Sequence, residues 1–215
     1  MRIEDSLSRC WDVSLTEPMK VEYHDYEWGT PTRSESRLFE FLSLSGMQAG
    51  LSWWTVWLRR QAFRNQFDNF DPTKIAEYDS AKLKMMLTDK VLIRNKVKLA
   101  AIVNNANAIC NLNPDFRNFS EYLWSFVDDQ PVINSWQEGA KIPTITPLAK
   151  VISKDLISRG FKFVGPTIVY AYIQSVGLVN DHYIGCFRHG TLPFDSIHPK
   201  LPERENEWGL RHALG

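Results

Sequence analysis

Two pairs of cysteine and histidine have the side chains of a metal site. Cys10 and His24 lie near the N-terminus with thirteen residues between them, and His182 and Cys186 lie toward the other end with three between them. Two cysteines and two histidines form a closed tetrahedral set for structural zinc. If residues 182–186 are helical, His182 and Cys186 share one face and can hold the same ion. Taken singly, each residue is more often a buried cysteine or a hydrogen-bonded core histidine, so the spacing alone leaves both interpretations open.

A segment bracketed by two glycines, Gly160 and Gly165, has the features of a phosphate site. It separates two helical patterns, and the second begins directly behind it, near Thr167. Backbone N–H groups at the start of that helix, its dipole and the charge of Lys162 would attract an anion. A tight turn between two helices, with glycine at the C-cap, explains the same residues and is slightly favoured by the sequence alone.

Aromatic and polar side chains are interleaved in residues 23–29 and again in residues 48–53. Five of the eight tryptophans fall within the first sixty residues. Such a cluster is typical of a slot for a flat, π-rich ligand, although a large aromatic core explains most of the tryptophans more simply. Asp25 and Glu27 are candidates for an acid–base pair, but carboxylates of this kind are more often helix caps or solvated charges.

The composition excludes several classes of protein. The 215 residues include 25 basic and 25 acidic side chains, so a polyanion must meet a local basic patch instead of bulk positive charge. With 44% hydrophobic and 23% charged residues, the chain is expected to fold as a globule. Three scattered cysteines argue against a disulfide framework, and no signal peptide or membrane-spanning run is recognisable. We therefore expect a soluble, cytoplasmic protein from a reducing compartment.

Helical periodicity and capping residues predict an all-α fold. Asp71-Pro72 and Asp79-Ser80 are expected to begin helices, because aspartate is a good N-cap and proline fits the first helical position. The other expected helices cover residues 34–46, 96–112, 147–158 and 168–177, with one more beginning near residue 119. No segment has the alternation of a strand. We expect a helical domain over residues 1–189 and a C-terminal tail over 190–215, where periodicity is lost.

Together these motifs resemble the DNA-3-methyladenine glycosylase I family of helix-hairpin-helix base-excision repair enzymes. The resemblance extends from about Cys10 to about Cys186, with several independent motifs in the family's order. The segments that carry it are Tyr23-His24-Asp25 with Glu27-Trp28-Gly29, Gln48 to Trp53, Leu123 to Phe126, Gly160 to Gly165, and Gly177 to His182. It implies a helix-hairpin-helix glycosylase fold in which a zinc site joins the N-terminal and C-terminal segments.

The resemblance also implies roles for individual residues. One structural zinc ion per chain would be bound by Cys10, His24, His182 and Cys186. The base pocket would contain Trp53 and Tyr23 as the rings that sandwich the extruded base, with Trp28 and, displaced by one position, Trp11. Gly50 and Leu51 would fill the space that the base leaves in the double helix. The phosphate-binding hairpin would comprise Gly160, Lys162, Phe163, Val164, Gly165 and Thr167.

Two pocket positions depart from the family pattern. The family has a glutamate that contacts the damaged base where this chain has Ser45, and a tyrosine where it has Lys20. Ser45 and Tyr23 are accordingly the candidate catalytic residues, and Lys20 is a candidate base contact. Asp181 lies roughly where other helix-hairpin-helix glycosylases have a catalytic aspartate. The family manages without that residue, so we expect Asp181 to be a structural neighbour of His182.

The implied activity is that of a monofunctional glycosylase. It would bind double-stranded DNA as a monomer, flip an alkylated adenine into the aromatic pocket, hydrolyse the N-glycosidic bond and release free 3-methyladenine. Ser45 and Lys20 motivate the alternative, a catalytically weak or inactive homologue that binds damaged DNA or another purine.

Overall fold

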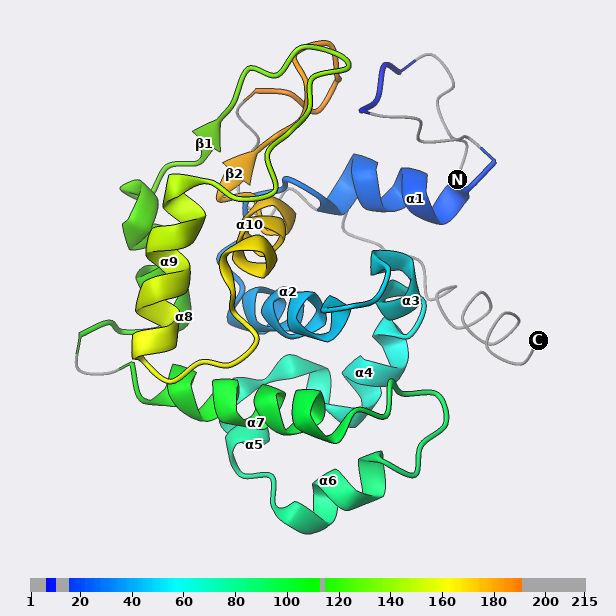
Figure 1. Cartoon of the computed structure of the whole chain (residues 1–215), viewed down its shortest axis with the longest axis vertical. Helices are drawn as coiled ribbons and strands as arrows, with labels where there is room; N and C mark the ends of the chain where they lie inside the picture. Colours follow the sequence, from blue (N-terminus) through cyan, green and yellow to red (C-terminus); the bar gives the residue numbers. More distant parts are fainter. Residues whose placement is uncertain (1–6, 11–15, 113–114, 191–215) are drawn as a thin grey trace.

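The computed structural model describes residues 7–10, 16–112 and 115–190. Within these residues the chain is mostly helical (Figure 1). The helices are α1 (Pro18–Glu22), α2 (Glu35–Gln48), α3 (Trp53–Trp57), α4 (Arg60–Gln66), α5 (Pro72–Ala76), α6 (Ser80–Met86), α7 (Lys96–Cys110), α8 (Phe119–Trp124), α9 (Pro147–Ser158) and α10 (Pro166–Ser175). A π-helical turn (Tyr23–Glu27) follows α1, and tighter single turns cover Asp68–Phe70 and Ser125–Val127.

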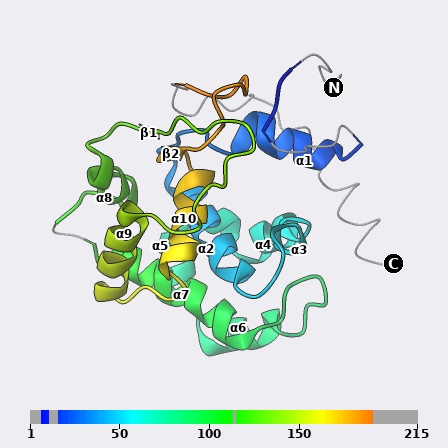
Figure 2. The same ribbon diagram turned by 45° about the horizontal axis from the view of Figure 1, so that its top comes forward.

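Helices α2 and α10 form the centre of the molecule. Helix α10 packs against α9 on one side and α2 on the other, and the view in Figure 2 keeps α10 between them. Every residue of α2 from Arg37 to Met47 is buried, including Leu38, Phe41 and Leu44, so the helix runs through the core. Helix α7 packs on α5 and α2. This core is the support on which the functional side chains are arranged.

The expected helix starts are confirmed by their caps. The Asp71 carboxylate accepts hydrogen bonds from the first turn of α5, with Pro72 at its first position. Asp79 accepts from the N–H of Lys82 at 2.8 Å. Helix α9 covers the expected residues, and Thr146 caps it. These starts are predictable because a cap bonds only to residues within the next turn.

The mostly helical character of the fold is confirmed, but two details of the expected secondary structure differ from the prediction. Helix α2 does not end at Gly46 but continues to Gln48, because the glycine is needed there for packing: a Cβ at this position would lie 3.3 Å from Cβ of Phe163. The fold is also not purely helical. Strands β1 (Val132–Ile133) and β2 (Val179–Asn180) form a short parallel pair with Val132 opposite Val179. Two residues are too few for the alternation that identifies a strand in a sequence.

No helix in the described ranges is both long and apolar enough to cross a lipid bilayer. The expected tail falls almost entirely outside the described residues, as does Trp11.

Candidate functional site

One short element positions side chains of three different kinds. In the π-helical turn Tyr23–Glu27, the N–H of Trp28 donates to the carbonyl of Tyr23, five residues earlier, at 2.8 Å. The wider turn sends Tyr23 toward a pocket, His24 toward two cysteines and Glu27 toward buried arginines. Single π-turns inside helices are frequent at functional sites, because the extra residue redirects the side chains around it.

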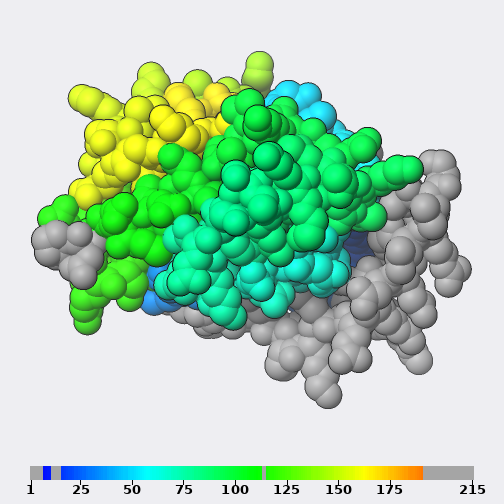
Figure 3. Space-filling view, turned by 90° about the horizontal axis from the view of Figure 1, so that it is seen from below, coloured from blue at the N-terminus to red at the C-terminus, as the bar shows by residue number. Residues whose placement is uncertain are grey.

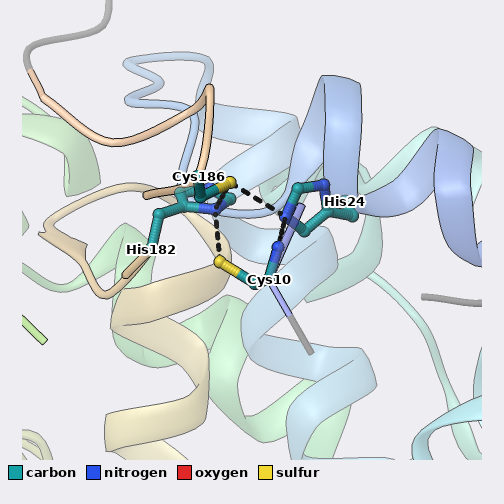
Figure 4. Close-up of side chains that lie close together, drawn as sticks. All are labelled: Cys10, His24, His182 and Cys186. Carbon is teal, nitrogen blue, oxygen red and sulfur yellow. Dashed lines mark hydrogen bonds between the residues drawn. The ribbon is translucent and has the colours of Figure 1, made fainter. Parts of the chain in front are cut away.

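Cys10, His24, His182 and Cys186 converge in one buried cluster (Figure 4). Sγ of Cys10 lies 3.3 Å from Nδ1 of His182, and Sγ of Cys186 lies 3.4 Å from Nε2 of His24 and 3.5 Å from Nδ1 of His182. All four ligand atoms lie within 4.8 Å of one another. A helix over residues 182–186 would have placed His182 and Cys186 on one face. These residues instead form turns after β2. The two ligands meet because the turns fold back on themselves.

The separations fit a tetrahedral metal ion. With metal–sulfur bonds of about 2.3 Å and metal–nitrogen bonds of about 2.0 Å, tetrahedral geometry puts sulfur and nitrogen ligands about 3.5 Å apart. Nδ1 of His24 lies 2.8 Å from Oδ1 of Asp25, and Nε2 of His182 lies 3.1 Å from the carbonyl oxygen of Trp28. These outer partners accept the proton of one ring nitrogen and leave the other nitrogen unprotonated, the form that binds a metal.

The sulfur atoms are also prepared to bind a cation. The N–H of Tyr183 donates to Sγ of Cys10, and the N–H of Arg188 donates to Sγ of Cys186, each at 3.4 Å. The contact with Cys10, opposed by burial and aided by the contacts with both histidines, lowers the pKa of the Cys186 thiol. The pKa of Cys10 is raised by the same contact and by burial. A thiolate, the metal-binding form of cysteine, is thus favoured at Cys186.

Asp25 and Glu27 are neither caps nor solvated charges, so this expectation is wrong. Asp25 is buried and accepts hydrogen bonds from the Arg9 guanidinium at 2.7 to 3.0 Å. Glu27 is buried and lies 2.8 Å from Nη1 of Arg60. Both carboxylates are therefore occupied by structural ion pairs, and neither lines the pocket.

A pocket of about 320 Å³ lies beside the metal cluster. It is lined by Lys20, Tyr23, His24, Trp28, Ser45, Gln48, Trp53, Trp54, Ala171, Gln174 and Ser175. The size and the four large aromatic side chains, one tyrosine and three tryptophans, are those of a site for a small flat ligand. Two of the lining residues carry a buried polar atom, Oγ of Ser45 and Nε1 of Trp53, that has no hydrogen-bond partner among the residues that the structure describes. A bound molecule can satisfy both, because a hydroxyl donates or accepts and an indole N–H donates.

The aromatic wall has a tilted geometry. The rings of Tyr23 and Trp53 have centroids 5.6 Å apart and an interplanar angle of 41°, so they contact each other and leave no parallel slot between them. The Tyr23 hydroxyl lies 3.1 Å from Oγ of Ser175. Burial, opposed by that hydrogen bond, raises the pKa of Tyr23, which keeps the phenol neutral. In this structure both rings form one continuous surface on which a base can stack, and insertion between them requires a ring to move.

Trp28 and Lys20 are two further residues that line the pocket. Trp28 is buried, and its ring packs against the His182 imidazole with centroids 4.5 Å apart, so it lies between this ligand candidate and the pocket that it lines. Nζ of Lys20 lies 2.6 Å from a carboxylate oxygen of Glu17 and 5.6 Å from the Trp54 ring centroid. The lysine lines the pocket, but Glu17 neutralises its charge.

A buried ion network lies behind the aromatic wall, and the sequence reasoning missed it. Arg60 bonds to Glu40 at 2.7 and 2.9 Å, and its guanidinium carbon lies 4.2 Å from the Trp57 ring centroid. Trp57 in turn packs on Tyr23 and Trp53. The sequence carries one sign of the network, since Glu40 stands between the apolar residues Phe39 and Phe41. The network holds the wall of the pocket from behind.

The glycine-bracketed segment is a hairpin between α9 and α10. Gly160 and Phe163 have φ angles of 87° and 55°, in the left-handed region that allows the tight turn. The side chain of Asn105 accepts from the N–H of Lys162 at 2.7 Å and donates to its carbonyl at 3.0 Å. Asn104 donates to the carbonyl of Gly160 at 2.8 Å. The hairpin is thus clamped to α7 by two asparagines.

The helix start behind the hairpin offers free donors. In the part of the chain that the structure describes, the N–H groups of Gly165, Thr167 and Ile168 have no acceptor. Lys162 and Thr167 are exposed, whereas the side chain of Val164 is buried and only its backbone can reach a ligand. Main-chain donors at a helix N-terminus beside an exposed lysine are a suitable site for a phosphate.

The remaining two candidates lie on a loop at the edge of the pocket. Gly50 has a φ of 75°, and Leu51 is 40% exposed. The loop joins α2 to α3, between Gln48 and Trp53, which both line the pocket. An exposed leucine therefore stands at the edge of the pocket.

Asp181 is saturated by structural hydrogen bonds. Its carboxylate accepts from Asn134 at 2.6 Å, Trp136 at 2.7 Å and Gln174 at 2.7 Å, and also from the Tyr170 hydroxyl. These bonds hold the segment that leads to His182, which agrees with the structural role expected for Asp181.

Comparison with known proteins identifies the family. The family model for methyladenine glycosylase matches residues 11–189. DNA-3-methyladenine glycosylase 1 of Escherichia coli K12 is 42% identical over 180 residues, which are 84% of this chain and 96% of the relative. A crystal structure of 3-methyladenine DNA glycosylase I is 44% identical, covers 85% of this chain and all of its own, and superposes with a TM-score of 0.80.

A tyrosine-to-phenylalanine variant of 3-methyladenine DNA glycosylase I has been solved in complex with 3-methyladenine. It is 31% identical to this chain, covers 82% of it and 95% of its own length, and superposes with a TM-score of 0.78. Since the family model covers most of the sequence and the relatives share both its residues and its fold, the chain belongs to the methyladenine glycosylase family.

Proposed function

We propose that the chain is a DNA base-excision repair glycosylase that releases 3-methyladenine from alkylated duplex DNA. The observation that carries the proposal is the aromatic pocket of about 320 Å³ with two unpartnered polar atoms, beside a hairpin with free main-chain donors. The relatives named above are glycosylases for this base, and one of them binds free 3-methyladenine.

The chemistry of the lesion suits a pocket of this kind. Methylation at N3 makes adenine cationic, so the base leaves the sugar as a neutral molecule and no strong acid is needed. The main energetic requirement is extrusion of the nucleotide, which costs a few kcal/mol of pairing and stacking. Stacking on Trp53 or Tyr23 returns about 1–3 kcal/mol, with a cation–π contribution of about 0.5–2 kcal/mol that favours the methylated base.

The donors at the hairpin account for binding to undamaged duplex. Phosphates held by the N–H groups of Thr167 and Ile168 and by Lys162 position the strand without reading its sequence. The formal charge is zero, so this local set of donors must supply the attraction. We expect one monomer to act on each lesion.

Ser45 is the basis of the alternative function. This residue lines the pocket, and its neutral hydroxyl is buried with no hydrogen-bond partner in the described ranges of the chain. A neutral group forms a weaker hydrogen bond to a cationic base than a carboxylate does. The alternative is a weak or inactive homologue that binds damaged DNA or another purine. The ion pair of Lys20 with Glu17 favours the enzyme, because it removes the repulsion that a free ammonium would exert on a cation.

We assign the Cys10, His24, His182 and Cys186 cluster to one structural zinc ion. Four ligands leave no open position for a reactant, so the ion would stabilise the fold and take no part in the reaction. Its ligands come from the two ends of the described chain, and binding would join them. Metal analysis of the purified protein should give one zinc per chain. Cys186→Ser should lose the zinc and melt at a lower temperature.

The third cysteine provides a control for the zinc assignment. Cys110 is exposed and lies outside the cluster, so Cys110→Ser should keep both the metal and the melting temperature. A metal-free wild type, as stable as the protein with added zinc, would disprove the assignment.

The activity is tested by release of free base from methylated duplex DNA. Wild type should release 3-methyladenine well above the spontaneous rate. Trp53→Ala should abolish most release yet bind undamaged duplex almost normally, because the hairpin is intact. Trp53→Phe keeps a flat ring at the same place and should retain much of the activity. Absence of release by folded, DNA-bound wild type eliminates the enzyme and leaves the alternative.

A further inference from the structure

Lys98 is a buried lysine without a carboxylate partner. It belongs to the first turn of α7 and is 8% exposed. Its ammonium donates to the carbonyl of Met47 at 2.8 Å and to the carbonyl of Ala49. Among the described residues no acidic side chain lies within ion-pair distance of it, and burial lowers its pKa. Burying an ammonium group away from water costs free energy, so the presence of a buried lysine at this position calls for an explanation.

The two carbonyls that it binds are at the end of α2. The last carbonyls of a helix lack partners within the helix and carry partial negative charge, so a cation from a neighbouring helix stabilises them. The chain then enters the loop with Gly50 and the exposed Leu51. Lys98 therefore fixes the point from which this loop leaves α2.

The same helix also holds the hairpin. Asn105 bonds to the backbone of Lys162 on both sides of the peptide unit. Lys98 and Asn105 are seven residues apart, so they share one face of α7 and are separated by about 10.5 Å along its axis. Gly46 meets Phe163 of the hairpin directly. In Figure 3 the green surface around α7 borders both the yellow α9–α10 region and the light-blue α2–α3 region.

We propose that Lys98 is a positioning residue. It holds the loop with Leu51 at the distance from the hairpin that lets this leucine enter the duplex while the hairpin binds the strand. Helix α7 acts as a rigid spacer: Asn105 holds the phosphate-binding segment at one level and Lys98 holds the inserting loop at another. This inference rests on the proposed function. It predicts a defect in opening the duplex, with base binding and the chemical step left intact.

The test compares substrates that do and do not require opening. Methylated poly(dA) is used alone and annealed to poly(dT). Lys98→Met keeps the length of the side chain but removes its donors, and should slow release from the duplex by about tenfold. Release from the single strand should change by less than about twofold, and inhibition by free 3-methyladenine should be unchanged. Equal losses on both substrates, or no loss on the duplex, would overturn the proposal.

Lys96 provides a matched control. It is an exposed lysine in the same turn, so Lys96→Met removes the same charge without touching the loop. Its effect on the two substrates should be equal. Should Lys98→Met fail to fold, Lys98→Gln, which is shorter and uncharged but keeps two N–H donors, replaces it in every comparison.

A double-mutant cycle tests whether Lys98 acts through Leu51. Leu51→Ala, at an exposed position, should itself slow release from the duplex. If Lys98 only positions this leucine, adding Lys98→Met should slow release by less than about twofold further. Two full, independent losses would mean that Lys98 acts in some other way.

A fluorescence measurement separates this inference from the proposed function. If wild type releases no base, the proposed function fails, but base unstacking can still be followed with 2-aminopurine opposite an abasic analogue in a duplex. Binding of wild type and of Lys96→Met should raise the fluorescence, and binding of Lys98→Met should not. A rise of the same size with Lys98→Met, or no rise with wild type, refutes the positioning role.

Discussion

The substitution Glu40→Gln tests whether the buried ions behind the pocket stabilise the protein. Glu40 is 4% exposed and accepts from Arg60 at 2.7 and 2.9 Å and from Arg64 at 2.6 and 3.1 Å. Glutamine has the same shape but no charge. It leaves the buried Arg60, which keeps its ion pair with Glu27, and the partly buried Arg64 facing a neutral amide, and a buried ion network that loses one of its carboxylates is destabilised.

The size of the effect follows from the pKa of Glu40. Burial raises this pKa, but the charges and hydrogen bonds of Arg60 and Arg64 outweigh burial and lower it from 4.5 to about 2. A difference of about 2.5 units corresponds to about 3 kcal/mol of folding free energy. Because the pKa is lower in the folded state, this stability is present above pH 4.5 and is lost as the pH falls toward 2.

Urea unfolding at two pH values measures this contribution. At pH 7, Glu40→Gln should lower the free energy of unfolding by about 3 kcal/mol. At pH 3.5 the difference in unfolding free energy between wild type and variant should be smaller by about 1.4 kcal/mol. Glu121, which pairs with Arg117 on the surface, provides the control, and Glu121→Gln should leave the stability unchanged. A loss below about 1 kcal/mol at pH 7, or a gap that does not depend on pH, would refute the reasoning.

Two further substitutions test the pocket and the metal cluster. Ser45→Glu should speed release of 3-methyladenine by about tenfold, because a carboxylate pairs with the cationic base, whereas Ser45→Gln should give no gain; equal rates in the two variants would contradict this. Asp25→Asn keeps all four metal ligands but removes the charged partner of His24, so competition with a chelator should show a zinc affinity weaker by about 10–100-fold. An unchanged affinity would mean that Asp25 serves only Arg9.

The sequence itself was sufficient for the local features of the fold. The starts of α5, α6 and α9 were predictable from Asp71, Asp79 and Pro147, because capping bonds and proline's fixed φ act within one turn. The four candidate metal ligands were recognisable by type and by family resemblance, and the structure brings them together. The end of α2 was mispredicted, because Gly46 is set by its contact with Phe163, more than a hundred residues away.

The tertiary structure alone decided which charges are buried and what surrounds the pocket. Aspartate and glutamate usually lie on the protein surface. Asp25 and Glu27 are buried because Arg9 and Arg60, from other segments, form ion pairs with them. The same holds for Lys98, whose acceptors are carbonyl groups that no sequence pattern distinguishes. Helical periodicity and capping residues involve neighbours in the sequence, so they can be recognised there. Ion pairs and ring contacts join residues far apart in the sequence, and no pattern along the chain marks them.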